Sequence, residues 1–440
     1  MRGCARPSSR PSRGFVDDVR RHTVKTCTLA TAPGCHVTTS SQPAPTSGAD
    51  DSRALIVGVP AETMEGERRV ALTPAVVPAL AKLGATVLVE SGAGVASGFT
   101  DAAYEEKGAR IGTRDEVLAA PVLVCVRVLS GDAKSPDLAK LHAGQVVVGM
   151  AAPFADPAVA GALGEAGVTL HSLELVPRTT RAQSMDVLSS QANISGFKAV
   201  IMAATALPKV FPLMTTAAGT MAPARVFVVG AGVAGLSAIA TARRLGAVVE
   251  AYDVRDAAKE EVKSLGAKFV EFDLDTGQEA GGSGAYATKM TDEQIAKQRE
   301  LMTKVVARSD VVITTAQVQG STAPVLVTED MVKAMAPGSV VVDLAAEQGG
   351  NVEPSRPGET VDVNGVQVIG PVNVPSQAPN HASLMYGKNV ANFLALIIKD
   401  GAVAPDPEDD IVNQSAVSRG GRIVNDRVQS ALGAGEGVTS

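Results

Sequence analysis

The stretch RVFVVGAGVAGLSAIATARRLGAVVEAYD, residues 225–253, decides the fold of this chain. It opens with a short apolar run, passes through a glycine-rich turn, continues with apolar residues at helical spacing, and closes with a second apolar run that ends at Asp253. This order predicts a strand, a tight turn, a helix and a second parallel strand, which is the repeating unit of a doubly wound sheet.

The glycines of the turn have the spacing of a dinucleotide-binding motif, with Gly230, Gly232 and Gly235 in the pattern G-x-G-x-x-G. The first glycine permits the tight turn, the second lets the backbone approach a pyrophosphate, and the third lets helix and strand pack closely. The phosphates would then face the positive end of the helix dipole and its free N–H groups. We therefore expect a dinucleotide to bind at this turn.

Asp253 lies eighteen residues beyond Gly235, at the end of the second predicted strand. A carboxylate there would accept hydrogen bonds from both ribose hydroxyls of the adenosine half and would repel a 2′-phosphate, which favours NAD(H) over NADP(H). Arg255 leaves the alternative open, because a guanidinium attracts a 2′-phosphate. An ordinary glycine-rich turn followed by a surface aspartate is the simpler interpretation of the same residues.

The rest of the chain alternates apolar runs with helical stretches, which predicts an α/β protein with two Rossmann-like, doubly wound parallel-sheet domains and a cleft between them. The Arg/Ser/Thr/Pro-rich start predicts disorder, as an organelle transit peptide or a start assigned too far upstream. The expected parts are a disordered or targeting tail (1–52), an N-terminal domain (53–176), an interdomain segment (177–216), an NAD(H)-binding domain (217–375), a helix returning to the first domain (376–401) and a loosely ordered tail (402–440).

Composition excludes several function classes. A net charge of −6 over 440 residues gives no basic surface for nucleic acid. The longest apolar stretches fall well short of the roughly 20 residues that cross a bilayer, so we expect a soluble chain whose membrane-spanning partners are separate chains. The four cysteines and five histidines show neither C-x-x-C nor a helical His pair, and no metal site is expected.

A second informative stretch, PRTTRAQSMDVLSSQANISGFKA (177–199), mixes charged, amide and hydroxyl side chains with apolar ones. A polar linker capped by Ser and Asn side chains would explain its composition. The stretch also closely resembles the loop that distinguishes the NAD(H)-binding subunit of proton-translocating transhydrogenases, which share a family with alanine dehydrogenases. The likeness extends over residues 54–401 and includes GVPAETMEGERRVALTP (58–74), PGSVVVDLAAEQGGN (337–351) and SLMYGKNVANFLALIIKDG (383–401).

The resemblance implies that the nicotinamide ring lies in the cleft, in contact with this loop. Gln183 matches the residue that brings two nicotinamides together, and Asp186 and Ser189 match residues that hold the ring and its ribose. Tyr286, beside Ala285, matches the tyrosine of a loop that closes over bound nucleotide. The catalytic positions implied are Arg178, Gln183, Asp186 and Ser189, and the further cofactor contacts are Gly230, Gly232, Val233, Gly235, Asp253, Val254, Arg255, Ala285, Tyr286 and Gln317.

Gln317 marks a departure from the family pattern. The usual Thr-Thr-Ala-Leu-Ile-Pro-Gly turn is here TTAQVQG, residues 314–320. Glutamines thus replace apolar residues near the expected nicotinamide position, and we expect Gln317 to alter the affinity for NADH.

By resemblance, the chain is the NAD(H)-binding subunit of a proton-translocating NAD(P)+ transhydrogenase. It would form a homodimer and transfer a hydride directly between NADH and NADP+, the latter held by an NADP(H)-binding partner subunit, with coupling to proton movement through membrane-spanning subunits. The expected location is cytoplasmic, on the cytoplasmic face of a bacterial inner membrane. If residues 1–52 are a transit peptide, the location is an organelle matrix.

Two alternatives stay open. Alanine dehydrogenase shares the fold and the ERRVALTP segment, with Arg69 matching its substrate arginine, but its lysine is absent from Val124-Cys125-Val126 and its histidine from residues 146–154. Without that acid–base pair a 2-oxo acid could not be processed. A non-catalytic NAD(H)-binding sensor is the other alternative, because a fold alone does not fix function.

Overall fold

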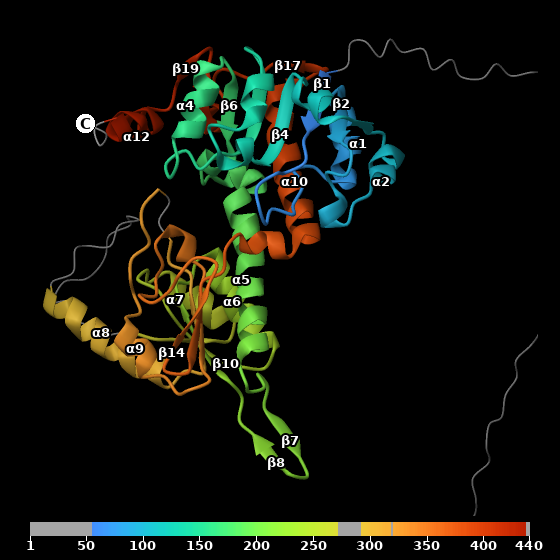
Figure 1. Cartoon of the computed structure of the whole chain (residues 1–440). Coiled ribbons are helices and arrows are strands. Elements are labelled where there is room, and N and C mark those ends of the chain that lie inside the picture. Colours follow the sequence, from blue (N-terminus) through green and yellow to red (C-terminus); the bar gives the residue numbers. More distant parts are fainter. Residues whose placement is uncertain (1–54, 272–291, 318–319, 437–440) are drawn as a thin grey trace, which may run out of the picture. The chain divides into compact units, whose positions relative to one another are not determined.

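The computed structural model describes residues 55–271, 292–317 and 320–436 (Figure 1). Two large sheets carry most of the strands, and helices connect successive parallel strands in both. The expected fold class, α/β with two doubly wound sheets, is confirmed, although both sheets are mixed at one edge.

The first sheet has the order β19-β18-β6-β5-β4-β1-β2-β3, in which the strands from β1 to β6 are parallel. Its strands are β1 Leu55–Val59, β2 Ala85–Glu90, β3 Arg110–Gly112, β4 Val122–Arg127, β5 Val146–Met150, β6 Thr169–Ser172, β18 Ala416–Arg419 and β19 Arg422–Ile423. The accompanying helices are α1 Val77–Ala81, α2 Asp101–Glu106, α3 Arg114–Leu118 and α4 Ala158–Glu165, with 3-10 turns at Pro74–Val76, Val95–Ser97, Val128–Gly131, Pro136–Lys140 and Leu173–Leu175.

The second sheet has the order β11-β10-β9-β12-β13-β15-β14, and its direction of winding reverses between β9 and β12. The strands are β9 Arg225–Val229, β10 Val248–Tyr252, β11 Lys268–Phe269, β12 Val311–Thr314, β13 Val340–Asp343, β14 Thr360–Val363 and β15 Val366–Ile369, of which β14 is antiparallel. The helices are α6 Val233–Arg244, α7 Ala258–Ser264, α8 Asp292–Ala307 and α9 Glu329–Lys333, with 3-10 turns at Ala346–Gln348 and Val374–Gln377.

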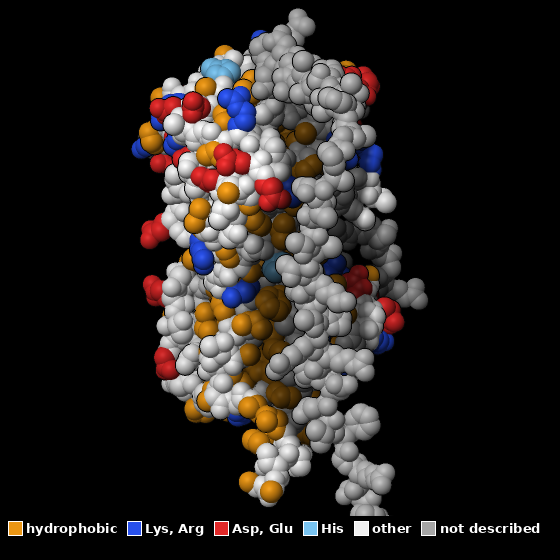
Figure 2. All heavy atoms as spheres, turned by 90° about the vertical axis from the view of Figure 1, so that its right-hand side faces the viewer, with side chains coloured by type: hydrophobic (Ala, Val, Ile, Leu, Met, Phe, Trp, Pro, Cys, Tyr) orange, Lys and Arg blue, Asp and Glu red, His pale blue; other side chains and the backbone are white. Residues whose placement is uncertain are grey.

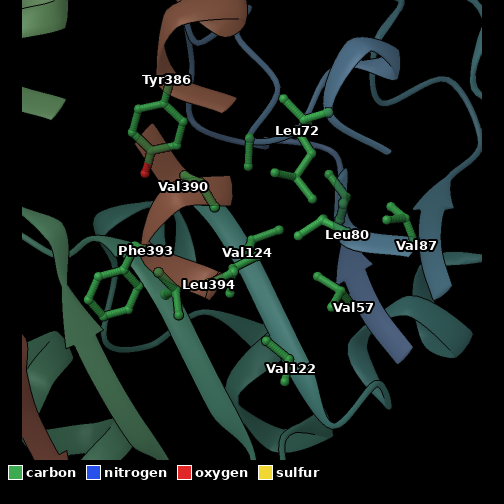
Figure 3. Close-up of a cluster of buried hydrophobic side chains, with 14 of the residues drawn as sticks. Val57, Leu72, Leu80, Val87, Val122, Val124, Tyr386, Val390, Phe393 and Leu394 are labelled. Carbon is green, nitrogen blue, oxygen red and sulfur yellow. The ribbon is translucent and has the colours of Figure 1, made fainter. Parts of the chain in front are cut away.

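Two long helices lie outside the βα units. Helix α5, Val187–Ala206, contributes Ala199, Val200 and Ala203 to a core cluster of the second sheet. Helix α10, Pro379–Ile397, packs its apolar side against the first sheet. Figure 3 shows this core, with side chains of α10 beside strand β4: Tyr386, Val390, Phe393, Leu394, Val122 and Val124.

The hairpin formed by β7 (Met214–Thr216) and β8 (Gly219–Met221) extends away from the second sheet (Figure 1). All six of its strand residues are exposed. A two-stranded hairpin has too little apolar burial to be stable by itself, so an exposed one is typical of a contact with another chain.

The expectation of a loosely ordered tail from residue 402 is wrong. After a small pairing of β16 (Ile398–Lys399) with β17 (Ala402–Val403), the chain forms α11 (Asp410–Ser415), strands β18 and β19, and α12 (Asp426–Glu436). Strand β18 pairs with β6, and apolar side chains of this region are buried in the core of the first sheet. The hairpin turn Gly420-Gly421, with φ of +58° and +77°, is the feature that could have predicted these strands.

Among the described residues, no helix has both the length and the apolar character needed to cross a bilayer.

Candidate functional site

The glycine-rich turn lies at the carboxyl end of β9, where the second sheet reverses its winding. Gly230 has φ of +95°, a left-handed conformation that favours glycine. A Cβ at Gly235 would meet the Gly230 carbonyl oxygen at 1.9 Å, whereas a Cβ at Gly232 would meet nothing within 4 Å. The three glycines thus provide the turn, the close helix–strand contact and an open backbone surface, as a bound pyrophosphate requires.

Helix α6 begins at Val233 without any side-chain cap, so its first N–H groups receive no hydrogen bond from a side chain of its own N-cap. This end of the helix favours an anion through its dipole and its free donors. Val233 and Val254 are 40% and 64% exposed beside the turn. Exposed apolar side chains next to a phosphate-binding turn can cover the flat face of an adenine ring.

Asp253 follows β10, and its carboxylate lies directly against the turn. It accepts hydrogen bonds from the Ala231 amide at 2.7 Å and from Nε of Arg255 at 2.9 Å. Burial favours a raised pKa, but the bonds from Arg255 and Ala231 outweigh it, so the pKa of Asp253 lies below its ordinary value. Asp253 is therefore ionised at neutral pH, as an acceptor for ribose hydroxyls must be, and the half-exposed Arg255 side chain lies over it.

The loop before α5 presents the expected nicotinamide-side residues. Thr180–Met185 forms a 3-10 turn in which Ala182 and Met185 are buried while Gln183 is exposed. Asp186 is the N-cap of α5, accepting from the Ser189 amide at 2.9 Å and from the Ser189 hydroxyl at 2.6 Å. The structure therefore brings Asp186 and Ser189 together and gives Asp186 a helix-capping role as well.

A cavity of about 210 Å³ adjoins the loop. Arg178, Asp186 and Leu188 line it together with Arg427 of α12, whose guanidinium lies 4.1 Å from the centre of the Phe154 ring. The Arg178 side chain is exposed and makes no hydrogen bond or ion pair with another described residue. Sequence analysis missed Arg427, because the tail that carries it was expected to be loosely ordered.

Helix α5 connects the loop to the glycine turn. Gly196 approaches α6 so closely that a Cβ there would meet the Ala234 carbonyl oxygen at 2.0 Å, and the Ser237 hydroxyl donates to the Asn193 carbonyl at 2.8 Å. The start of α6 thus contacts α5 about 15 Å along the helix from Asp186, at 1.5 Å per residue. One rigid helix therefore carries the loop at its end and the nucleotide turn at its middle.

Three other side chains hold the loop, and sequence analysis assigned a role to none of them. Asn389 and Asn392 of α10 donate to the Ser184 carbonyl at 2.8 and 3.0 Å. Arg181 makes a two-pronged ion pair with Asp409, both bonds at 2.8 Å. The partners are more than two hundred residues from the loop in sequence, so local pattern could not reveal them.

The remaining expected contacts divide into two groups. Gln317 donates to the Leu344 carbonyl at 2.7 Å, so its side chain bonds to backbone of the second sheet. Ala285 and Tyr286 lie outside the described residues.

The environment of Arg69 bears on 2-oxo-acid chemistry. Its guanidinium is 2% exposed and bonds to Glu67 at 2.6 and 2.8 Å, to Gln191 at 2.9 Å and to Asn373 at 3.2 Å. Burial acts to raise the pKa of Glu67, but bonds from Arg69 outweigh it and lower that pKa to about 2. Arg69 is thus neutralised within the protein, and Cys125, at the position where a lysine would be required, is buried in β4.

Family comparisons agree with this geometry. The model described as alanine dehydrogenase/PNT, N-terminal domain, matches residues 58–195, and the model for the C-terminal domain matches residues 199–426. The chain belongs to the alanine dehydrogenase/PNT family.

Within this family the chain is similar to transhydrogenase subunits. It is 44% identical to an NAD(P) transhydrogenase subunit alpha chain of Rhodospirillum rubrum, over 84% of this chain and 97% of that protein. The crystal structure of transhydrogenase from Sinorhizobium meliloti superposes with a TM-score of 0.76 at 45% identity, covering 84% of this chain and all of that one. Similarity to alanine dehydrogenase of Bacillus subtilis is lower, 28% over 86% of this chain and 95% of that protein.

Proposed function

We propose that this chain is the NAD(H)-binding subunit of a proton-translocating NAD(P)+ transhydrogenase. The observation that carries the proposal is the placement of Gln183, exposed on a loop with a buried base at the start of the helix that packs against the glycine-turn helix. An NADH molecule bound at the glycine turn would extend toward that loop and leave one face of its ring for a second nucleotide.

The described residues fit NAD(H). The pyrophosphate would lie against the open backbone at Gly232 and the uncapped start of α6. The ionised Asp253 would accept the ribose hydroxyls, in competition with Arg255, while Val233 and Val254 cover the adenine. Roles for Ala285 and Tyr286 in closing over the nucleotide remain predictions from family resemblance.

The reaction is hydride transfer from C4 of the NADH ring to C4 of the NADP+ ring, by which NADH is oxidised to NAD+ and NADP+ is reduced to NADPH. No proton moves with the hydride, so the protein supplies no acid or base. Arg178, Asp186 and Ser189 would orient the NADH ring and its ribose, and Gln183 would align the two rings. Positioning is then the main source of catalysis.

The proposal includes partners. NADP+ would be held by an NADP(H)-binding subunit, and transfer would be coupled to proton movement through membrane-spanning subunits, with this chain on the cytoplasmic face of the membrane or in an organelle matrix. Two copies would form a homodimer through an apolar surface that runs down to the β7–β8 hairpin (Figure 2). Its exposed members are Phe197, Val210, Leu213, Met214 and Met221.

Neither alternative function gains support from a specific observation. Alanine dehydrogenase activity needs a guanidinium open to a carboxylate, and Arg69 is buried and fully engaged. A sensor without hydride transfer would have no need of Gln183.

The test is transfer from NADH to an NADP+ analogue by the full chain with a partner NADP(H)-binding subunit present. Gln183→Asn shortens the side chain and should lower the transfer rate by about 100-fold, because misplaced reacting groups lose rate steeply. NADH affinity should stay within about twofold. Ser184→Ala, which changes an exposed neighbouring side chain but keeps the carbonyl, is the matched control. A Gln183→Asn protein with unchanged transfer would favour the sensor, and wild-type protein without transfer would exclude the proposed activity.

A further inference from the structure

We infer that Asn389 of α10 is a positioning residue for Gln183, an inference that rests on the proposed function. Asn389 does not itself line the cavity beside the loop. Its side chain amide donates to the carbonyl of Ser184, the residue that follows Gln183, at 2.8 Å. The bond fixes the peptide next to the one exposed amide that hydride transfer would use.

The loop around Gln183 has little freedom once this bond is made. Ala182 and Met185, on either side, are buried in the same core cluster as Val390 and Phe393 of α10. Asn392, one turn further along α10, adds a bond to the same Ser184 carbonyl at 3.0 Å. Gln183 is therefore an exposed side chain on a short backbone segment held from below by one helix.

The unpaired oxygen of Asn389 distinguishes a positioning role from a stabilising one. The side chain is 8% exposed, and its Oδ1 has no hydrogen-bond partner among the described residues. A buried acceptor without a partner costs free energy, and an apolar side chain of similar size would avoid that cost. Stability alone would therefore not favour asparagine here, whereas holding the Ser184 carbonyl requires an N–H donor.

A second contact holds the loop from the other side. Arg181 pairs with Asp409, which also caps α11 by accepting from the Ile411 amide at 2.9 Å and the Val412 amide at 3.2 Å. The Arg181 side chain is half exposed, so solvent and salt screen this pair. The buried amide of Asn389 is thus the stronger constraint, and the ion pair is the adjustable one.

The experiment replaces Asn389 with leucine in the full chain and measures three quantities: NADH affinity, the unfolding midpoint, and the rate of transfer with the NADP(H)-binding subunit. We expect affinity within about twofold, an unfolding midpoint equal to or above that of wild type, and transfer slowed about tenfold or more. Amide hydrogen exchange across residues 181–185 should speed up, which reports loop freedom without any turnover.

Asn380→Leu is the matched control, because Asn380 lies on the same helix and donates to the Ser97 carbonyl at 2.8 Å, away from the loop. Asn389→Ala serves as a second variant if leucine disturbs folding. Unchanged transfer and exchange in an active background would overturn the inference, as would equal slowing by Asn380→Leu or a parallel loss of stability and rate. If wild-type protein itself transfers no hydride, the proposed function fails first and this inference falls with it.

Discussion

At Gly232 and Gly235, the same added methyl group meets opposite surroundings. A Cβ at Gly232 enters open space in front of α6, whereas a Cβ at Gly235 would meet the Gly230 carbonyl oxygen at 1.9 Å. We predict that Gly232→Ala weakens NADH binding about tenfold or more by occupying the phosphate position, with little change in stability. Gly235→Ala should lower the free energy of unfolding by about 1–3 kcal/mol, because it overpacks the helix–strand contact.

Thermal unfolding and fluorescence titration with NADH separate the two effects. Equal losses of stability in both variants, or unchanged NADH affinity in Gly232→Ala, would remove the glycine turn as the phosphate site.

Single residues also show how far the sequence reaches. The glycine spacing predicted three separate roles, and each has a matching geometry, because a tight turn and a close packing contact are local requirements. Asn389 and Asp409 could not be predicted in the same way. Their contacts with the loop depend on how helices from distant parts of the chain pack, which no local pattern encodes.

Among the elements, the β7–β8 hairpin carries the clearest prediction. Leu213 and Met214 are 61% and 41% exposed at its start, which a solvated hairpin would not need. If two copies associate there, Leu213→Asp should raise the dissociation constant of the dimer by about 100-fold, because a carboxylate would be buried in an apolar contact. Sedimentation across a concentration series measures the change.

Val95→Asp is the control, since Val95 is also 61% exposed but lies in a 3-10 turn of the first sheet's segment. A Leu213→Asp protein that sediments as wild type, or a wild-type protein that is monomeric at all concentrations, contradicts the hairpin interface.

The tail after α10 illustrates what element-level patterns miss. Strands β18 and β19 have four and two residues, too short for alternation to stand out, and Pro and Asp residues just before them suggested a loop. What orders the segment is edge pairing with β6 and burial of Val417 and Val428, both tertiary effects.

For the whole molecule, the alternation of apolar runs and helices was enough to predict two doubly wound sheets, because each βα unit must cover a sheet face. The sequence did not reveal that the last strands of the chain complete the first sheet, or that Arg427 reaches the cavity beside the loop. Both require the chain ends to return to elements formed far earlier.

The central claim is that NADH bound at the glycine turn presents its ring to the 178–189 loop with one face free. A crystal structure of the full chain with NADH tests it most directly. We predict phosphates against Gly232 and α6, the ring beside Asp186 and Gln183, and one ring face open to solvent. A ring distant from this loop, or enclosed by this chain on both faces, would contradict the claim.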